Sequence, residues 1–166
     1  MAKTEEEWSA GVILFRLRRG GQGKDKDKDK EEQWEREYLL LQHREGHWDF
    51  PKGHIEPTED LKEAACRELR EETQIDSTKL IPGFQGLIEY DLERGGRSIE
   101  KRVIYFLGET EVEEVRLSKE HQAFVWFGYR EALERLTYEN SRFLLRQAEQ
   151  FLKEKEEEDR SRGREE

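Results

Sequence analysis

The amino-acid sequence predicts a single α/β domain, and three observations lead to this prediction. The chain has 166 residues, which is enough for one compact domain and too few for two cores of ordinary size. Apolar residues make up 33% of the chain, but they are gathered into short segments that can form a core. Segments typical of strands also alternate along the chain with segments typical of helices. We therefore expect one domain at residues 1–152 and a charged tail at residues 153–166.

Five segments have the composition of β-strands. Residues 8–17 are rich in β-branched, aliphatic and aromatic side chains, as expected of a buried strand. The others are residues 38–42, 84–92, 102–108 and 123–128, with a turn at Gly95 and Gly96. Between the first two strands the sequence contains several glycines and a Lys-Asp alternation. We interpret about residues 19–33 as a disordered insert, because this composition cannot bury a core.

Two segments have helical periodicity. Residues 59–73 place Leu61, Ala65 and Leu69 on one stripe, with Thr58 as the expected N-cap. The loop before this helix, at residues 45–57, is rich in Gly, Pro and His. A second helix is predicted at residues 141–152, followed by a solvated, frayed tail. The side chains expected to face the core from the second helix are Phe143, Leu144, Ala148, Phe151 and Leu152.

Charge and cysteine content exclude several classes of function. A formal net charge of −10 opposes broad electrostatic binding to DNA or to an anionic membrane. No stretch approaches the roughly 20 apolar residues that a membrane span needs, and the acidic residues 1–7 lack the apolar run of a secretory signal. The single cysteine excludes an internal disulfide. We therefore expect a monomeric cytoplasmic protein whose partner is a small molecule.

Three carboxylates on the first predicted helix point to metal chemistry. Glu68, Glu71 and Glu72 stand at i, i+3 and i+4, which places them on one helix face. Like charges this close repel, and a divalent cation removes the repulsion. A phosphoanhydride is itself anionic, so an acidic site can approach it only through cations. The alternative interpretation is an ordinary solvated acidic face.

The segment that carries these residues resembles the Nudix box. The box is a Gly, five residues, a Glu, seven residues, Arg-Glu, an aliphatic residue, any residue, Glu-Glu, any residue, a Gly and an aliphatic residue. The exception is Gln74, where the family usually has Gly; Gln should either cost up to about 1 kcal/mol in the left-handed backbone or shift the turn slightly. The positions that agree are Gly53, Glu59, Arg67, Glu68, Leu69, Glu71, Glu72 and Ile75.

The resemblance implies a fold and a metal site. The fold is a mixed β-sheet sandwiched between helices, an α/β/α sandwich. Glu68, Glu71 and Glu72 would supply metal ligands together with the carbonyl of Gly53, and the ion would be Mg²⁺, with Mn²⁺ as the alternative. Arg67 would orient the carboxylates as part of the catalytic machinery, and Glu59 would be structural or an outer ligand.

Sequence outside the box resembles the asymmetric diadenosine tetraphosphate hydrolases of the same family. The segment Trp-Asp-Phe-Pro-Lys-Gly-His-Ile-Glu-Pro begins at residue 48, and Arg-Leu-Ser-Lys-Glu-His-Gln-Ala begins at residue 116, followed by Trp126. The resemblance implies that Lys52 contacts phosphates, with His47 and His54 nearby. It also implies that Glu120 is an extra metal ligand or the general base. Tyr90, Phe124 or both would stack on the adenine; Tyr90 is the better candidate, and the alternative for Phe124 is a place in the core.

These residues together predict attack by an activated water on the polyphosphate chain, giving ATP and AMP from diadenosine tetraphosphate. Glu68 and Glu120 compete as the base that accepts the proton. The alternatives within the same chemistry are a pyrophosphohydrolase of RNA 5′ ends and a hydrolase of inositol pyrophosphates. A different class of function is a non-catalytic nucleotide- or RNA-binding subunit, which the presence of all three carboxylates disfavours.

Overall fold

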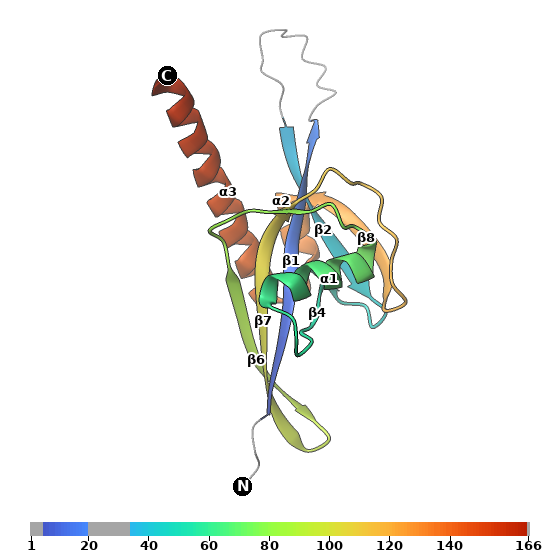
Figure 1. Cartoon of the computed structure of the whole chain (residues 1–166). Helices are drawn as coiled ribbons and strands as arrows, with labels where there is room; N and C mark the ends of the chain where they lie inside the picture. The colour runs from blue at the N-terminus through green and yellow to red at the C-terminus, as the bar shows by residue number, and fades with distance from the viewer. Residues whose placement is uncertain (1–4, 20–33, 166) are drawn as a thin grey trace.

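The fold is a mixed β-sheet with helices on both faces, as predicted (Figure 1). It is seen in a computed structural model that describes residues 5–19 and 34–165. Apart from Arg19, the insert predicted at residues 19–33 lies outside the described residues. No helix in the described ranges is long and apolar enough to cross a membrane.

The sheet is built around two long parallel neighbours, β1 and β7, and every other pairing in its described part is antiparallel. Its central order is β3-β2-β1-β7-β5, while β4 pairs with β1, β6 with β7 and β8 with β2. In chain order the elements are β1 (Glu5–Arg19), β2 (Trp34–His43), β3 (Trp48–Asp49), β4 (Lys52–His54), α1 (Leu61–Thr73), β5 (Lys79–Leu80), β6 (Gly86–Arg94), β7 (Arg97–Glu109), β8 (His121–Gly128), α2 (Tyr129–Arg135) and α3 (Glu139–Glu165).

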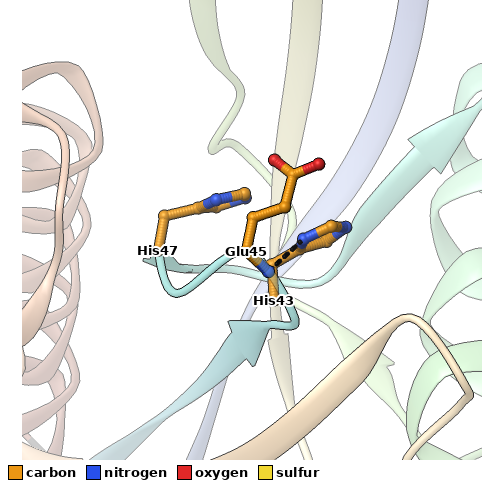
Figure 2. Close-up of side chains that lie close together, drawn as sticks. All are labelled: His43, Glu45 and His47. Carbon is orange, nitrogen blue, oxygen red and sulfur yellow. Dashed lines mark hydrogen bonds between the residues drawn. The ribbon is translucent and has the colours of Figure 1, made fainter.

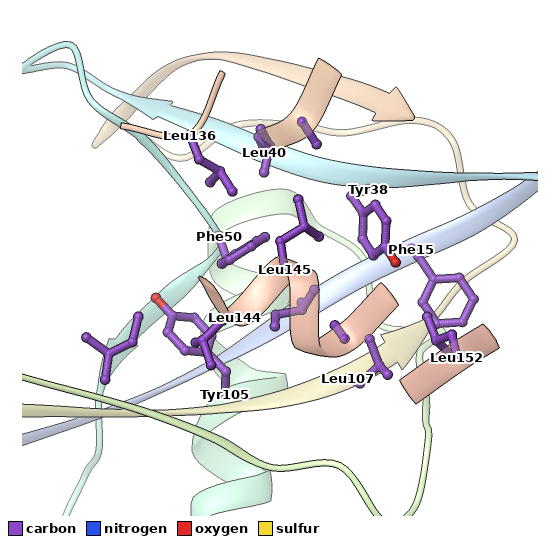
Figure 3. Close-up of a cluster of buried hydrophobic side chains, with 14 of the residues drawn as sticks. Phe15, Tyr38, Leu40, Phe50, Tyr105, Leu107, Leu136, Leu144, Leu145 and Leu152 are labelled. Atoms are coloured by element: carbon purple, nitrogen blue, oxygen red, sulfur yellow. The ribbon is translucent and has the colours of Figure 1, made fainter. Parts of the chain in front are cut away.

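Two hydrophobic cores lie on opposite faces of the sheet, because successive side chains of a strand point in opposite directions. From β1, Ile13 joins the core beneath α2 and α3, where Leu144 and Tyr105 also pack (Figure 3). Its neighbour Leu14 joins the core beneath α1, where Leu69 packs. The central strands are therefore buried on both faces, and α1 is fixed against the sheet.

Helix α1 has a defined capping residue at each end. Its N-cap is Asp60, whose side chain accepts a hydrogen bond from the backbone N–H of Glu63 at 2.8 Å. The prediction of Thr58 as N-cap was wrong, because an aspartate two residues later satisfies the first turn. At the other end Gln74 adopts the left-handed conformation, with φ 64°, and its N–H donates to the carbonyl of Arg70. Gln74 thus takes the left-handed backbone expected at this position of the box.

The last helix differs from its predicted extent. It runs from Glu139 to Glu165, so residues 153–165 are helical and not frayed, and α3 projects past the sheet (Figure 1). Its segment beyond Leu152 is rich in Glu, Lys and Arg, which favour helix without needing to be buried. Phe143, which was expected to face the core, is 56% exposed, whereas Leu145, which was not expected there, is fully buried. The helical stripe through Leu144 and Ala148 selects Leu145, since Phe143 lies on the opposite side of the turn.

Four short elements were not predicted from the sequence. Strands β3 and β4 lie within the segment expected to be a loop, and β5 and α2 are also additions. Strand β4 pairs with β1, with Gly53 opposite Ala10. This pairing matters for function, because it attaches the loop before α1 to the centre of the sheet.

Candidate active site

Arg67 joins the acidic side chains around α1 into one cluster. Its guanidinium donates two hydrogen bonds to Glu59, at 2.6 and 2.9 Å. It also donates to Glu68 at 2.9 Å, to Glu71 at 3.0 Å and to the backbone carbonyl of His54 at 2.9 Å. A planar guanidinium can bind several oxygens in fixed directions, which an ammonium cannot. Arg67 therefore holds Glu59, Glu68 and Glu71 in place against the loop that precedes the helix.

Gly53 leaves the space that the Glu68 carboxylate occupies. A Cβ atom added at residue 53 would lie 2.1 Å from Cδ of Glu68, far inside van der Waals contact. Strand β4 therefore brings its backbone directly against this carboxylate. The glycine of the box is required here for close approach and not for a special backbone angle.

Glu72 is the most strongly perturbed acid of the cluster. It is 5% exposed, and its carboxylate accepts a hydrogen bond from the backbone N–H of Lys52 at 3.2 Å. Burial raises the pKa of Glu72 to about 9, and the neighbouring charges of Glu68 and Glu120 add to the increase. Burial also raises the pKa of Glu68. Burial and acidic neighbours therefore disfavour the ionised forms of Glu68 and Glu72.

The donor set fits a divalent cation. Glu68, Glu71 and Glu72 lie at i, i+3 and i+4 on α1, Glu68 and Glu71 both accept hydrogen bonds from Arg67, and the Gly53 backbone approaches Glu68 closely. Oxygen donors of this kind are those that Mg²⁺ and Mn²⁺ prefer. A cation would favour the ionised form of the buried Glu72, which burial and the acidic neighbours disfavour, and this supports the fit.

Glu120 faces the same group of acids from a different part of the chain. It precedes β8, its backbone carbonyl accepts a hydrogen bond from the N–H of Arg44 at 3.0 Å, and its side chain is exposed. Its charge contributes to the raised pKa values of both Glu68 and Glu72. The structure thus brings Glu120 to the box carboxylates, although nearly fifty residues separate them in the sequence.

A cleft of about 390 Å³ lies over the carboxylates and carries two lysines. Glu72 and Glu120 line it together with Lys52, Gly53 and His54. Lys101 on β7 also lines the cleft, and no role was predicted for this residue. The pKa of Lys101 is lowered by burial and by the nearby charge of Lys52. Alternation along β7 could have revealed it, since Lys101 occupies a position that otherwise holds core residues.

A second cavity, of about 420 Å³, adjoins this cleft and has aromatic walls. Tyr90 and Tyr138 line it, with Asn140 and Ser141 from the start of α3. His47, Asp49 and Lys52 line both cavities, so the two are contiguous. Tyr90 is the cross-strand partner of Lys101, which directs both side chains to one face of the sheet. Tyr138 and the α3 residues were missed because they follow a helix that the sequence did not reveal.

Phe124 is not brought into this pocket. It lines a separate shallow hollow with Val115, Trp126 and two glutamates. Its cross-strand partner is Leu41, which belongs to the core on the α1 face. The pocket of Tyr90 also involves Val103 and Tyr105, which belong to the opposite core. Phe124 and Tyr90 therefore lie on opposite faces of the sheet.

The two histidines predicted near substrate line the cleft as neutral groups. Burial lowers the pKa of His47, and the charge of His43 lowers it further. Burial also lowers the pKa of His54, with Lys101 as the next contribution. The His47 ring lies 5.7 Å from the ring of Tyr138, at the junction of pocket and cleft. At pH 7 both histidines are therefore mainly neutral.

Comparison with known proteins agrees with this geometry. The model of the NUDIX domain matches residues 12–147. The mouse (Mus musculus) bis(5′-nucleosyl)-tetraphosphatase [asymmetrical] is 42% identical over 122 residues, covering 70% of this chain and 80% of the mouse protein. An RNA pyrophosphohydrolase of Caulobacter vibrioides is 33% identical over 98 residues, covering 57% of this chain and 49% of that protein.

A solved structure extends the similarity to three dimensions. The crystal structure of a C. elegans Ap4A hydrolase binary complex superposes with a TM-score of 0.70 at 30% identity. It covers 88% of this chain and 97% of the C. elegans chain. The family match, the sequence identity and the arrangement of Arg67 with its carboxylates all agree. This chain belongs to the Nudix family of hydrolases.

Proposed function

We propose that this Nudix hydrolase cleaves dinucleoside polyphosphates, and that it converts diadenosine tetraphosphate to ATP and AMP. The observation that carries the proposal is the contiguity of an aromatic pocket with a cleft that contains both lysines and carboxylates. The pocket volume of about 420 Å³ suits a nucleobase. The reaction named for the mouse and C. elegans relatives supports the same substrate.

In this proposal Tyr90 and Tyr138 hold the adenine by contact with its π face. Their place in one pocket supports this assignment, and Tyr138 takes the role that the sequence analysis gave to Phe124. Base–aromatic stacking contributes about 1–3 kcal/mol per base in nucleic-acid complexes. The polyphosphate then extends from the pocket past His47 into the cleft, where the ammonium groups of Lys52 and Lys101 bind its oxygens.

The ion that we propose is Mg²⁺, held by Glu68, Glu71, Glu72 and the carbonyl of Gly53. When bound, such an ion neutralises phosphate charge and makes phosphorus more susceptible to attack by water. Arg67 holds the carboxylates in position, and its hydrogen bond to the His54 carbonyl fixes the loop that carries Gly53. His54 completes the wall of the cleft beside this loop.

Glu120 is the general base in this mechanism. One oxygen of Glu68 already accepts a hydrogen bond from Arg67, whereas Glu120 is exposed in the cleft. As the water oxygen forms its bond to phosphorus, its proton passes to the Glu120 carboxylate. The bridging P–O bond breaks, and the departing nucleotide leaves as a phosphate anion whose charge Lys52 and Lys101 balance. No covalent enzyme intermediate is needed.

A comparison of two variants tests the choice of base. Glu120→Gln should lower kcat by about 10²–10⁴-fold with little change in KM, because it removes proton transfer and leaves the substrate contacts in place. Glu68→Gln should also weaken metal binding, so its activity should recover in part as Mg²⁺ is raised. Recovery of Glu120→Gln at high Mg²⁺ would instead make Glu120 a metal ligand, and an active Glu120→Gln would exclude it from the chemistry.

A substrate panel tests the reaction class. We expect faster turnover of dinucleoside polyphosphates than of 5′-triphosphate RNA or inositol pyrophosphates, because the aromatic pocket takes one base and the cleft has a short cationic wall. Preference for triphosphate RNA would favour the activity named for the C. vibrioides relative. Tight nucleotide binding without turnover of any substrate would favour a non-catalytic subunit.

We also propose that the protein works as a monomer in the cytoplasm, with residues 1–152 as its catalytic domain. Light scattering of the active protein tests this proposal, and activity that appears only in a dimer would contradict it.

A further inference from the structure

The turn between β2 and β3 holds two histidines and a glutamate on one rigid loop. The backbone N–H of His43 donates to the carbonyl of His47 at 2.9 Å, and the N–H of Gly46 donates to the carbonyl of His43 at 2.8 Å. Gly46 has a φ of 107°, which glycine adopts without strain. Arg44 ties the turn to the segment before β8, because its N–H donates to the Glu120 carbonyl. The loop is therefore closed by its own backbone and anchored from outside.

The three side chains converge above this turn. One ligand atom each from His43, Glu45 and His47 lies within 4.8 Å of the others. The two imidazole rings are stacked, with centroids 4.7 Å apart and planes 10° from parallel. Figure 2 shows the Glu45 carboxylate on the same side of the loop as both rings. A fourth donor, His121, is close: its ring lies edge to face with the His43 ring, and the two ring centroids are 5.8 Å apart.

We propose that His43, Glu45 and His47 form a binding site for a transition-metal ion of the Zn²⁺ class. Two imidazole nitrogens and one carboxylate oxygen are a donor set that zinc, cobalt, nickel and copper prefer, whereas Mg²⁺ prefers oxygen ligands alone. The site is thus chemically distinct from the carboxylate cluster on α1. Three protein ligands leave a fourth coordination position for water, for His121 or for a phosphate oxygen.

Binding requires the two histidine rings to rotate out of their stacked arrangement, because the lone pair of an imidazole nitrogen lies in the ring plane and both planes must contain the ion. Zinc bonds of about 2.0–2.2 Å at tetrahedral angles place ligand atoms about 3.4 Å apart, so ligand atoms that now lie up to 4.8 Å apart must approach one another by up to about 1.4 Å. Nδ1 of His43 accepts a hydrogen bond from the Glu45 N–H at 3.1 Å, so in the neutral ring Nδ1 holds the lone pair, and this hydrogen bond must break when Nδ1 binds an ion. The ion replaces that N–H as its partner, and the exposed amide can then bind water.

The position of the site links it to the nucleotide. His47 lines both the aromatic pocket and the cleft, and His43 lines the cleft. An ion on these side chains lies where the polyphosphate passes from pocket to cleft. Its open coordination position is therefore available to a phosphate oxygen of the substrate.

Calorimetric titration of Zn²⁺ into the whole protein, in saturating Mg²⁺ and without nucleotide, tests the proposal. The wild-type chain should bind one equivalent of Zn²⁺, which His43→Gln and His47→Gln should lose. The chain has four histidines, so His54→Gln is a matched control and should keep the equivalent. Co²⁺ should give a visible absorption band in the wild type and in His54→Gln only. Circular dichroism confirms that each variant is folded.

Two results would overturn the proposal. One is absence of Zn²⁺ binding by the wild type in Mg²⁺. The other is binding that persists unchanged in folded His43→Gln and His47→Gln, which would place the ion on other residues. Neither result depends on hydrolysis of any nucleotide, so failure here is distinct from failure of the proposed enzyme function.

Discussion

Replacing Glu72 by glutamine should stabilise the metal-free protein at neutral pH. The pKa of Glu72 is raised from 4.5 to about 9 in the folded chain, chiefly by burial. At pH 7 the carboxylate is therefore ionised in the unfolded chain and protonated in the folded one. Because pH 7 lies about 2.5 units above the pKa of the unfolded chain, taking up this proton on folding costs about 3 kcal/mol, at 1.36 kcal/mol per pH unit. Glutamine has no proton to take up, and its oxygen can still accept the Lys52 N–H.

The sign of this effect sets its pH dependence. Because the folded-state pKa lies above the unfolded value, the cost is absent below about pH 4.5 and grows as pH rises towards 9. In denaturant unfolding with a chelator, Glu72→Gln should exceed the wild type by about 3 kcal/mol at pH 7 and match it near pH 4. The exposed Glu71→Gln is the control and should change stability by less than about 1 kcal/mol. Equal stability of Glu72→Gln and wild type at pH 7, or a difference independent of pH, would show that Glu72 is not protonated in the folded metal-free chain.

Three further substitutions test other parts of the site and of the helix that carries it. Gly53→Ala should lower kcat at least about 10-fold while the protein stays folded, because its Cβ displaces the Glu68 carboxylate, which we propose as a metal ligand. Gly128→Ala, whose Cβ meets nothing within 4 Å, should retain wild-type kinetics. Tyr138→Ala should raise KM for diadenosine tetraphosphate about 5- to 150-fold in steady-state assays, whereas an equal effect of Phe124→Ala would contradict the pocket assignment. Gln74→Gly should raise the free energy of unfolding by up to about 1 kcal/mol, because Gln74 has a φ of 64°, which glycine adopts without strain. Thermal melts measure this change, and a lower Tm would show that the left-handed turn is not strained.

The sequence predicted those features that depend on local spacing. The three box glutamates share a helix face because the helical repeat requires it, and the mixed α/β architecture followed from the order of apolar segments. The left-handed turn at Gln74 was expected because the resemblance placed a glycine position there. The adjacent boundary was wrong: Thr58 and Asp60 are both good capping residues, and their sequence alone does not decide which one closes the first turn.

Features that depend on tertiary contacts could not be predicted in this way. Tyr90 on β6 and Tyr138 in the turn before α3 line the same pocket, although they are far apart in the sequence. No local sequence pattern predicts such a tertiary contact. Lys101 was visible as a charged residue within an apolar alternation, but only the structure shows that it opens into the cleft. Phe124 has the aromatic character that suits a nucleobase, but its strand register places it on the opposite face of the sheet from Tyr90.

The most direct test of the proposed function is the product analysis of diadenosine tetraphosphate after incubation with the protein in Mg²⁺. Ion-exchange chromatography should show ATP and AMP in equal amounts, and both should disappear when a chelator is added or when Glu120 is replaced by glutamine. Formation of ADP alone would mean symmetrical cleavage, and an intact substrate beside a folded, metal-loaded protein would mean that another polyphosphate is the substrate. Either result would contradict the assignment of this chain as an asymmetrical dinucleoside tetraphosphate hydrolase.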